Sequence, residues 1–366
     1  MLHLITADLP SDGLALVGQL QRRLACQGPP PQLLDLSGEG LLASQDWDHA
    51  AGTVFQQGDY QLLVWGRIKP GVNDWLELLH LQEARPERCP PLPGLAQLLQ
   101  TVALAEWLAA PAEGKFPTDC AGGTVGGTDP ERVVLLPPLH QALQLLELAR
   151  IGPDLLDHWM EPLLLWWQET RKSLSRLDLL LRLTLPDGDA LRLAPLWRQR
   201  LQSAAALLAD PGRHQLLCVL DGGAGLATHL GDRLCQTYLK GFQPARLWLA
   251  GSGTAPALQA LAEIRGPLAI GHGPQLHHGG RQLEAWLDQP WTAEASLQWQ
   301  LDAEPASCRL LLPGLRKPLL QVQQIDQELV IQVAGSSRLV PLPGALAGRQ
   351  CTGAKLSGRH LQLQFQ

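Results

Sequence analysis

The sequence predicts an α/β fold: a doubly wound, mainly parallel sheet with a helical insertion, followed by a small C-terminal all-β sandwich module. Three observations predict it. Short apolar runs alternate with longer helical patterns through the first two thirds of the chain, which is typical of a parallel α/β sheet. Helical patterns are almost continuous between residues 137 and 210. From Cys308 onward, apolar and polar residues alternate with a period of two.

These changes of pattern divide the chain. Residues 1–290 are predicted to form the α/β domain, with its helical insertion at about 137–210. Residues 291–307, with their Pro, Ser and Ala, are predicted to be a linker, and residues 308–366 the β module. The length of 366 residues is more than a single core usually supports, which agrees with a large domain and a smaller one.

The first element is a buried strand over Leu2–Thr6, followed by a helix over Gly13–Cys26. Leu14, Val17 and Leu20 give this helix its apolar face, and the prolines after Gly28 end it. Further strands are expected where apolar runs are bounded by Gly, Pro or Asp turns. They are Leu33–Leu36, Tyr60–Trp65, Arg132–Leu136, Gln215–Leu220 and Arg246–Ala250.

The turn after the first strand stands where a nucleotide-binding α/β fold places its phosphate loop. Such a loop needs glycines whose backbone N–H groups surround the phosphates, a Lys for the terminal phosphates and a Ser or Thr for Mg²⁺. Here the positions are Asp8, Leu9, Pro10, Ser11, Asp12 and Gly13. Pro10 has no N–H, and no Lys or Arg precedes Arg22. Two carboxylates in this turn would repel a triphosphate.

Ser11 and Asp12 directly precede Gly13, so we expect a side-chain oxygen to cap the helix and take the place of a phosphate. The residues alone leave a second interpretation open, in which this is an ordinary strand-to-helix turn that never held phosphate. We expect no bound cofactor at this turn.

The most apolar part of the insertion is a helical segment that begins at Leu155. It carries more apolar bulk than a solvated helix needs. It is either an internal helix buried against its neighbours or a groove for an apolar partner. As candidate partner-binding residues we take Leu155, Leu156, Trp159, Met160, Leu163, Leu164, Trp166 and Trp167.

Two other segments could suggest a ligand. Residues 220–234 are glycine-rich between a strand and a helix but lack Gly-Lys-Ser/Thr, so we interpret them as a strand-to-helix turn rather than a small-anion site. His272, His277 and His278 are close in sequence, but no Cys, Asp or Glu lies at ligand spacing, so no metal site is predicted.

Composition narrows the class of protein. The formal net charge of −6 offers no basic field for nucleic acid. Charged residues make up only 17 %, so an apolar surface for partners fits the composition. The seven cysteines are scattered and odd in number, which favours reduced thiols. There is no secretory signal pattern and no apolar run long enough to cross a bilayer, so we expect a cytoplasmic protein.

The C-terminal module also carries a family resemblance. Residues 310–365 contain "LPG" at 312–314, "ELVIQV" at 328–333, "PLPGALAGR" at 341–349 and "GAKL" at 353–356. They resemble the small-heat-shock-protein-like (α-crystallin) module appended to some ArsA/GET-type ATPases, the arsenite-pump and tail-anchored-protein-targeting family. This appended form is typical of a branch in photosynthetic bacteria. The resemblance implies a sheet of the P-loop NTPase type.

When the N-terminal part is compared with the same family, it resembles a divergent member. Residues 2–28 match the family's opening strand, phosphate loop and helix, and keep "LACQG" at the helix end. The family's second nucleotide motif falls on residues 133–152. The position of its magnesium-linked Asp is here near Leu135 and Leu136, and the carboxylate is missing. The loop lysines are missing, and so is the Cys-x-x-Cys pair that links some family dimers through zinc.

The resemblance implies the fold, whereas the residues argue against ATP hydrolysis. We therefore expect a non-hydrolysing, homodimeric member of this family that binds an apolar client or partner, with neither nucleic acid nor a membrane span. Two alternatives stay open. The protein could bind or slowly hydrolyse ATP with Mg²⁺ through non-standard residues, or it could be a structural subunit of a complex.

Overall fold

A computed structural model describes most of the chain and divides it into two compact units. Unit 1 comprises residues 1–29, 131–143 and 211–366, and unit 2 comprises residues 30–130 and 144–210. The described residues are 1–44, 54–56, 95–109, 131–155, 158, 162, 164–172, 195–223, 225–251, 254–262, 266, 268–274, 276, 280–291, 300–301 and 307–366.

Unit 1 contains five parallel strands in the order β4-β1-β5-β6-β7. The central strand β1 pairs Leu4 with Val134 of β4 on one side and with Leu216 of β5 on the other. Its six residues are all buried, as expected of a strand covered on both faces. The strands are β1 (Leu2–Ala7), β4 (Arg132–Leu135), β5 (His214–Asp221), β6 (Pro244–Ala250) and β7 (Ala269–Gly273).

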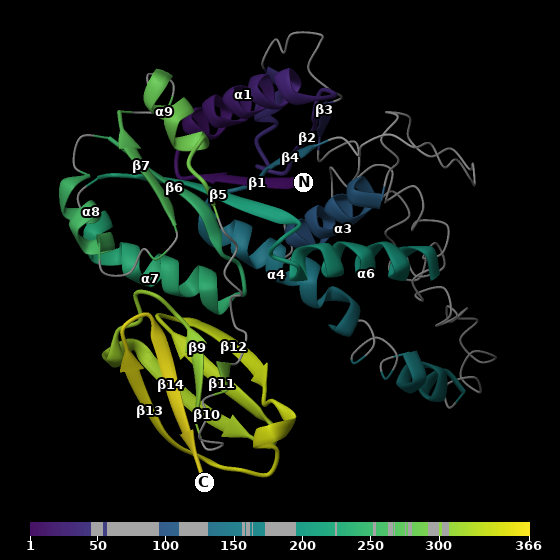
Figure 1. Cartoon of the computed structure of the whole chain (residues 1–366). Coiled ribbons are helices and arrows are strands. Elements are labelled where there is room, and N and C mark those ends of the chain that lie inside the picture. Colours follow the sequence, from purple (N-terminus) through teal and green to yellow (C-terminus); the bar gives the residue numbers. More distant parts are fainter. Residues whose placement is uncertain are drawn as a thin grey trace. The chain divides into compact units, whose positions relative to one another are not determined.

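Helices cover both faces of these strands, as Figure 1 shows: α1 and α9 lie on one face, and α7 and α8 on the other. Parallel strands with helices on both faces confirm the predicted α/β class. The helices of this unit are α1 (Pro10–Gln27), α7 (Leu226–Leu239), α8 (Ala255–Ala262) and α9 (Gly280–Leu287).

Unit 2 contains a short parallel pair, β2 (Gln32–Asp35) and β3 (Val54–Gln56), with the 3₁₀ turn η1 (Leu41–Ser44). Two helices, α3 (Leu95–Ala109) and α6 (Pro195–Ala209), pack through Ala105, Leu201 and Ala204. An ion pair between Glu106 and Arg200 joins the same helices. Helix α4 (Leu139–Leu155) belongs partly to each unit, and residues 164–172 are helical. The described part of the predicted insertion is therefore helical.

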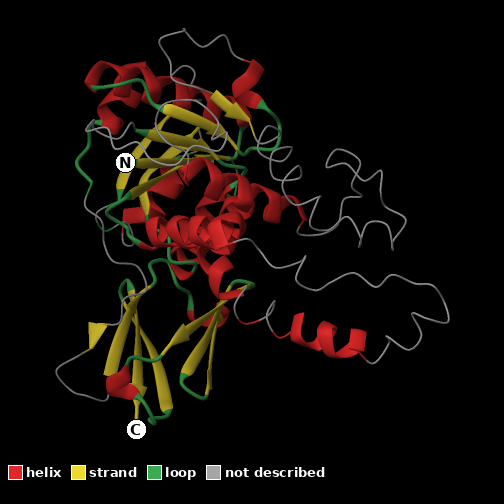
Figure 2. Ribbon diagram, turned by 90° about the vertical axis from the view of Figure 1, so that its right-hand side faces the viewer, coloured by secondary structure: helices red, strands yellow, loops and turns green. Residues whose placement is uncertain are grey.

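The C-terminal β module lies in unit 1 and has two antiparallel sheets, seen as the strand-rich body that ends at the C-terminus in Figure 2. One sheet has the order β10-β11-β12 and the other β13-β14-β9-β8. Their inner faces share one core, which includes Ile331, Leu363 and Phe365. The strands are β8 (Gln300–Leu301), β9 (Ser307–Leu311), β10 (Leu320–Ile325), β11 (Glu328–Val333), β12 (Ser336–Pro341), β13 (Cys351–Ser357) and β14 (His360–Phe365). Short 3₁₀ turns occur at η6 (Lys317–Leu319) and η7 (Gly344–Leu346).

The period of two is visible in β14, where Leu361, Leu363 and Phe365 are buried and the residues between them are not. The hairpin between β11 and β12 turns through Ala334 and Gly335, whose φ angles are 49° and 82°. Positive φ at both central residues is the geometry that matches the twist of paired strands. The all-β module is therefore confirmed.

Several boundaries differ from the prediction. Helix α1 begins at Pro10 rather than Gly13, because proline suits the first helical position. The predicted strand Tyr60–Trp65 lies outside the described residues. Two residues of the predicted linker, Gln300 and Leu301, pair with β9 as β8. Among the described residues, no helix is both long and apolar enough to cross a membrane.

Candidate functional site

Backbone hydrogen bonds start helix α1 after β1. The N–H groups of Asp12 and Gly13 both donate to the carbonyl of Leu9, at 3.2 Å. Leu9 is the N-cap residue in extended conformation, and no side chain caps the helix. The expectation that Ser11 or Asp12 is the cap is therefore wrong: with Pro10 at the first helical position, Asp12 already lies inside the first turn.

Asp8 is tied to α7 and to the end of β5. Its Oδ2 accepts a hydrogen bond from Nη1 of Arg233 at 2.7 Å and another from the backbone N–H of Asp221 at 3.1 Å. The Asp8 N–H itself donates to the carbonyl of Val219. The carboxylate at the start of this turn thus joins three segments of unit 1.

Asp12 is buried, with only 1 % of its surface exposed. Its Oδ1 accepts a hydrogen bond at 2.8 Å from the backbone N–H of Leu276, which follows β7. This carboxylate therefore connects the first turn of α1 to the segment between β7 and α9. One oxygen of this buried group thus has an internal hydrogen-bond donor, as is usual for buried polar groups.

Leucines fill the neighbouring end of β4. Leu135 and Leu136 are both 2 % exposed. A Cβ built on Gly13 would lie 3.1 Å from Cδ1 of Leu135, so this leucine packs directly against the start of α1. An apolar side chain stands beside the turn at the place where the family resemblance puts a magnesium-linked carboxylate, and it offers no ligand to a metal.

The glycine-rich segment after β5 is a strand-to-helix turn, as predicted, and it runs from Asp221 to the start of α7 at Leu226. Gly222 is required there because a Cβ on it would lie 2.5 Å from the carbonyl oxygen of Ala250. Burial, with a smaller effect from the Asp8 carboxylate, raises the pKa of the Cys218 thiol on β5.

No group of three or more metal-binding side chains occurs among the residues that the structure describes. His272 is exposed on β7, and His277 and His278 lie outside the described residues. At this edge Asp8 binds Arg233 and the backbone N–H of Asp221, whereas Asp12 binds the backbone N–H of Leu276. Among the described residues of the turn after β1, from Asp8 to Gly13, there is no Lys or Arg.

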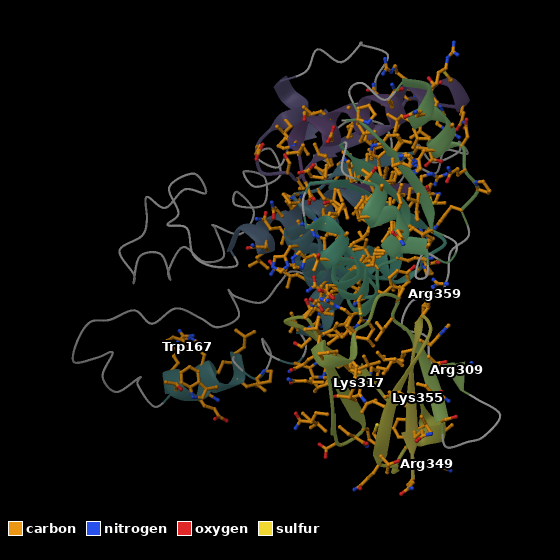
Figure 3. All side chains as sticks on the ribbon, turned by 90° about the vertical axis from the view of Figure 1, so that its left-hand side faces the viewer. Trp167, Arg309, Lys317, Arg349, Lys355 and Arg359 are labelled. Atoms are coloured by element: carbon orange, nitrogen blue, oxygen red, sulfur yellow. The ribbon has the colours of Figure 1, made fainter. Side chains whose placement is uncertain are left out.

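The candidate partner-binding residues are described in part. Leu164 is buried, Leu155 and Trp167 are half-buried, and Trp166 is 59 % exposed. Leu156, Trp159, Met160 and Leu163 lie outside the described residues. Figure 3 shows the helix at 164–172 with Trp167 labelled. Leu165, which the sequence analysis left out, is 56 % exposed beside Trp166. Residues 163–167 are five consecutive apolar residues, so the sequence pattern does not indicate which of them are exposed.

Helix α7 also packs against the β module. Nε of Arg316 donates to Oδ1 of Asp232 at 3.0 Å, and a second bond of the guanidinium completes the ion pair. Gln236 donates to the carbonyl of Ala334, and Lys240 to that of Ser337. Cys235 and Tyr238 are part of the module's core. The sequence pattern does not indicate this interface, because its partners are 84 to 98 residues apart in the chain.

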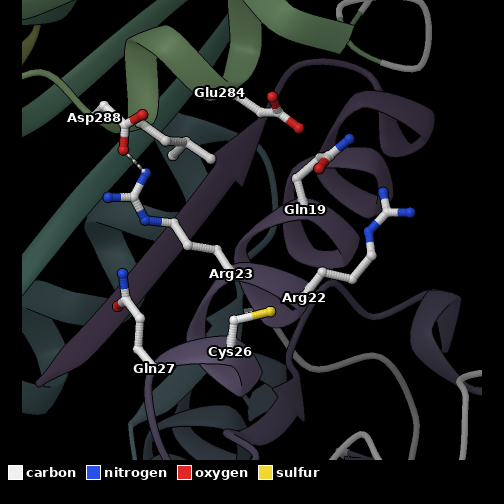
Figure 4. A pocket seen from close by; sticks show the side chains of 8 residues that line it. Gln19, Arg22, Arg23, Cys26, Gln27, Glu284 and Asp288 are labelled. Atoms are coloured by element: carbon white, nitrogen blue, oxygen red, sulfur yellow. Dashed lines mark hydrogen bonds and ion pairs between the residues drawn. The ribbon is translucent and has the colours of Figure 1, made fainter.

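A groove of about 520 Å³ lies between α1 and α9, seen in Figure 4. Arg23 reaches across it to Asp288, with 2.5 Å between Nη1 and Oδ1. Burial lowers the pKa of the nearby Arg246, and the charge of Arg23 lowers it further. Charges of both signs line the groove, so it selects neither an anion nor a cation. Its lining residues are Gln19, Arg22, Arg23, Cys26, Gln27, Glu284, Leu287 and Asp288.

Comparison with known proteins identifies the module. Residues 306–365 match the family model described as the HSP20-like domain found in ArsA. The match covers the β module and supports a relation to the ArsA family. Over 317 residues the chain is 27 % identical to an uncharacterized protein of Streptomyces coelicolor, a match that spans 79 % of this chain and 75 % of that protein.

Proposed function

We propose that this protein is a non-hydrolysing relative of the ArsA/GET-type ATPases that binds an apolar client or partner in a chaperone-like manner. The observation that carries the proposal is the internal use of both carboxylates in the turn after β1. Asp8 bonds Arg233 and Asp12 bonds the backbone of Leu276, at the position where a phosphate loop would hold ATP.

Electrostatics supports the absence of nucleotide. A unit negative charge about 4 Å from a phosphate oxygen costs about 4 kcal/mol at an effective dielectric near 20. Arg233 offsets the charge of Asp8 but is thereby unavailable to a phosphate. Asp12 remains as a buried carboxylate in the first turn of α1. Leu135 and Leu136 offer no metal ligand at the position where the family resemblance places a magnesium-linked carboxylate, which supports a protein without metal-assisted hydrolysis.

Exposed apolar side chains in unit 2 support the binding of a client. Leu165 and Trp166 are more than half exposed on neighbouring positions of one helix, and Leu98 of α3 and Ile151 of α4 are also exposed. Large apolar groups are usually kept from water, and their exposure marks interaction surfaces. The β module, which matches an HSP20-like domain, agrees with a chaperone-like role. We propose a homodimer in the cytoplasm as the working form.

The test is capture of a fluorescent apolar helical peptide by the purified full chain. Replacing Leu165 and Trp166 together by Ser should weaken capture by about tenfold or more, because about two buried apolar side chains are lost from the contact. The matched control is Leu339→Ser in β12, since Leu339 is 50 % exposed on the β module. Equal capture by the wild type and the Leu165/Trp166 variant would contradict client binding at this helix.

The alternatives give different results in the same preparations. Release of phosphate from Mg·ATP, lost on substitution of Arg233, would favour an ATPase that uses non-standard residues. A stable complex of fixed stoichiometry with a protein of the source cell, combined with no capture of apolar peptides, would favour a structural subunit.

A further inference from the structure

The groove between α1 and α9 has walls of opposite charge. Helix α1 contributes the guanidinium groups of Arg22 and Arg23. The other wall contributes the carboxylates of Glu284 on α9 and of Asp288 directly after it. In the described lining, the α1 wall has no acidic residue and the α9 wall no basic one. Such a groove suits a molecule that carries both a positive and a negative group.

An ion pair joins the two walls on one side of the groove only. It is the pair between Arg23 and Asp288. Figure 4 shows Arg22 and Glu284 on the side away from this pair, with Gln19 between them in this view. Within the part of the chain that the structure describes, neither the Arg22 nor the Glu284 side chain has a hydrogen-bond or ion-pair partner. One cation and one anion therefore remain available in the same groove.

Buried contacts hold the α9 wall in place. Trp286 is 1 % exposed, and its Nε1 donates a hydrogen bond at 3.2 Å to the carbonyl of Ala269 on β7. Arg246 of β6 donates through Nη2 to the carbonyls of Leu287 and Gln289, at 2.9 and 2.7 Å. The charged groups of α9 thus stand on a helix that is already fixed, which lowers the cost of ordering a site when a ligand binds.

Arg246 adds positive charge beside the groove. It is 8 % exposed, and its Nε and Nη1 are buried without a hydrogen-bond partner among the described residues. Arg23 and Asp288 lie close enough to act on it electrostatically. With Arg22 there are three guanidinium groups here against the two carboxylates of the α9 wall, so an additional carboxylate would improve the balance of charge.

We infer that this groove binds a small zwitterion of the short-peptide class, with its carboxylate on Arg22 and its ammonium group on Glu284. The Gln19 amide can donate to a peptide carbonyl or accept from a peptide N–H. The cavity of about 520 Å³ has the size of a small-molecule site. Leu287 is the one aliphatic residue in the described lining, so the groove suits the charged ends of a ligand rather than an apolar body. The inference does not depend on client binding in unit 2.

The experiment measures how trialanine protects Cys26 from a thiol-directed alkylating reagent in the full chain. Cys26 lines the groove and is exposed. Trialanine carries a free ammonium and a free carboxylate, whereas its N-acetylated and C-amidated forms each lack one. Contacts to exposed charges suit a dissociation constant on the order of 1 mM, so trialanine at about 10 mM should slow the labelling of Cys26 by about fivefold to tenfold. Both blocked peptides should have little effect.

Variants locate the site. Arg22→Gln and Glu284→Gln should each raise the trialanine concentration needed for half protection by about fivefold to tenfold. Arg281→Gln is the matched control, because it removes a charge from α9 at a position outside the described lining and should leave protection unchanged. All three side chains are exposed, so the fold tolerates their replacement. Comparing labelling with and without trialanine in each variant cancels any change in the reactivity of the thiol itself.

Each other outcome overturns the inference. No protection at about 10 mM trialanine would mean that the groove does not bind this class of ligand. Protection by the acetylated peptide equal to that by trialanine would show a site for anions alone, and equal protection by the amidated peptide a site for cations alone. Protection unchanged in Arg22→Gln and Glu284→Gln would place the ligand elsewhere. Equal loss in Arg281→Gln would mean that total charge, rather than this groove, controls binding.

Discussion

The guanidinium of Arg233 on α7 lies 2.7 Å from the carboxylate of Asp8, in the turn that follows β1. The residue before it, Asp232, pairs with Arg316 of the β module. Two consecutive residues of one helix therefore bind the turn after β1 and the C-terminal module. Through α7 the module is fixed to the α/β strands of unit 1 rather than tethered to them by a linker alone.

The Asp8–Arg233 pair should contribute modestly to stability. Both side chains are partly exposed, at 21 % and 39 %, so solvent screens the interaction. Asp8→Asn and Arg233→Gln should each lower the free energy of unfolding by about 0.5–1 kcal/mol, and the double variant should lose less than their sum. Urea unfolding of all four proteins measures the coupling. Fully additive losses would contradict a direct interaction.

Asp12 should contribute more to stability than Asp8 does, because Asp12 is buried. Asp12→Ala removes the acceptor of the Leu276 N–H and leaves that donor unsatisfied, at a cost of about 1–3 kcal/mol. Asp12→Asn keeps an oxygen at the same position and should cost less. Chemical denaturation gives both values. A neutral Asp12→Ala would mean that this hydrogen bond does not hold the β7–α9 segment to α1.

Gly314 should be essential to the contact between α7 and the β module. Its φ is +77°, and a Cβ there would collide with the carbonyl oxygen of Gly231. Gly314→Ala should cost about 2 kcal/mol or more, since backbone strain and the collision add. Gly335→Ala is the control: its φ is +82° but nothing lies within 4 Å of a Cβ, so only strain of about 1 kcal/mol applies. Equal losses would show that the two backbones can separate without cost.

The reactivity of the Cys235 thiol should report whether the β module is packed against α7. It lies in the core shared by α7 and the module, and burial, with a smaller effect from Asp232, raises its pKa to about 12. Its thiol should stay unreactive towards a thiolate-directed reagent at neutral pH, while the exposed Cys26 reacts. Gly314→Ala should speed the labelling of Cys235 and leave that of Cys26 unchanged, as peptide mass spectrometry would show. Rapid labelling of Cys235 in the wild type would contradict the packing of the β module against α7.

The environment of Glu131 gives a prediction for the stability of the protein at low pH. The hydrogen bond from His3, together with the N-terminal amino group, holds the pKa of Glu131 below its ordinary value of 4.5 despite desolvation. A carboxyl with a lowered folded pKa contributes stability that is present above the unfolded pKa and is lost as pH falls through the folded one. Stability should therefore fall less in Glu131→Gln than in the wild type between about pH 5 and pH 3. Glu39→Gln, at an exposed site, is the control; parallel curves for wild type and Glu131→Gln would refute the linkage.

Local patterns predicted the strands well. Strands β1, β4, β5 and β6 lie within two residues of their predicted bounds, because each is an apolar run closed by turn residues. The module strands follow from their period of two. The start of α1 was misplaced because the prediction favoured a side-chain cap over the suitability of Pro10 for the first helical position.

The sequence pattern could not predict contacts between residues that are far apart in the chain. Asp12 bonds the backbone of a residue 264 positions later, and nothing in the residues around Leu276 indicates that it is the donor. The close approach of Gly231 and Gly314 likewise depends on how a helix and a turn meet. That no nucleotide binds at this turn stays a prediction from its residue types.

The measurement that tests the central claim most directly is a calorimetric titration of the purified full chain, free of co-purified nucleotide, with Mg·ATP and Mg·ADP. The internal bonds of Asp8 and Asp12 predict no heat of binding up to millimolar nucleotide. Binding at micromolar nucleotide, with release of phosphate from ATP, would contradict the account and restore a nucleotide-driven cycle.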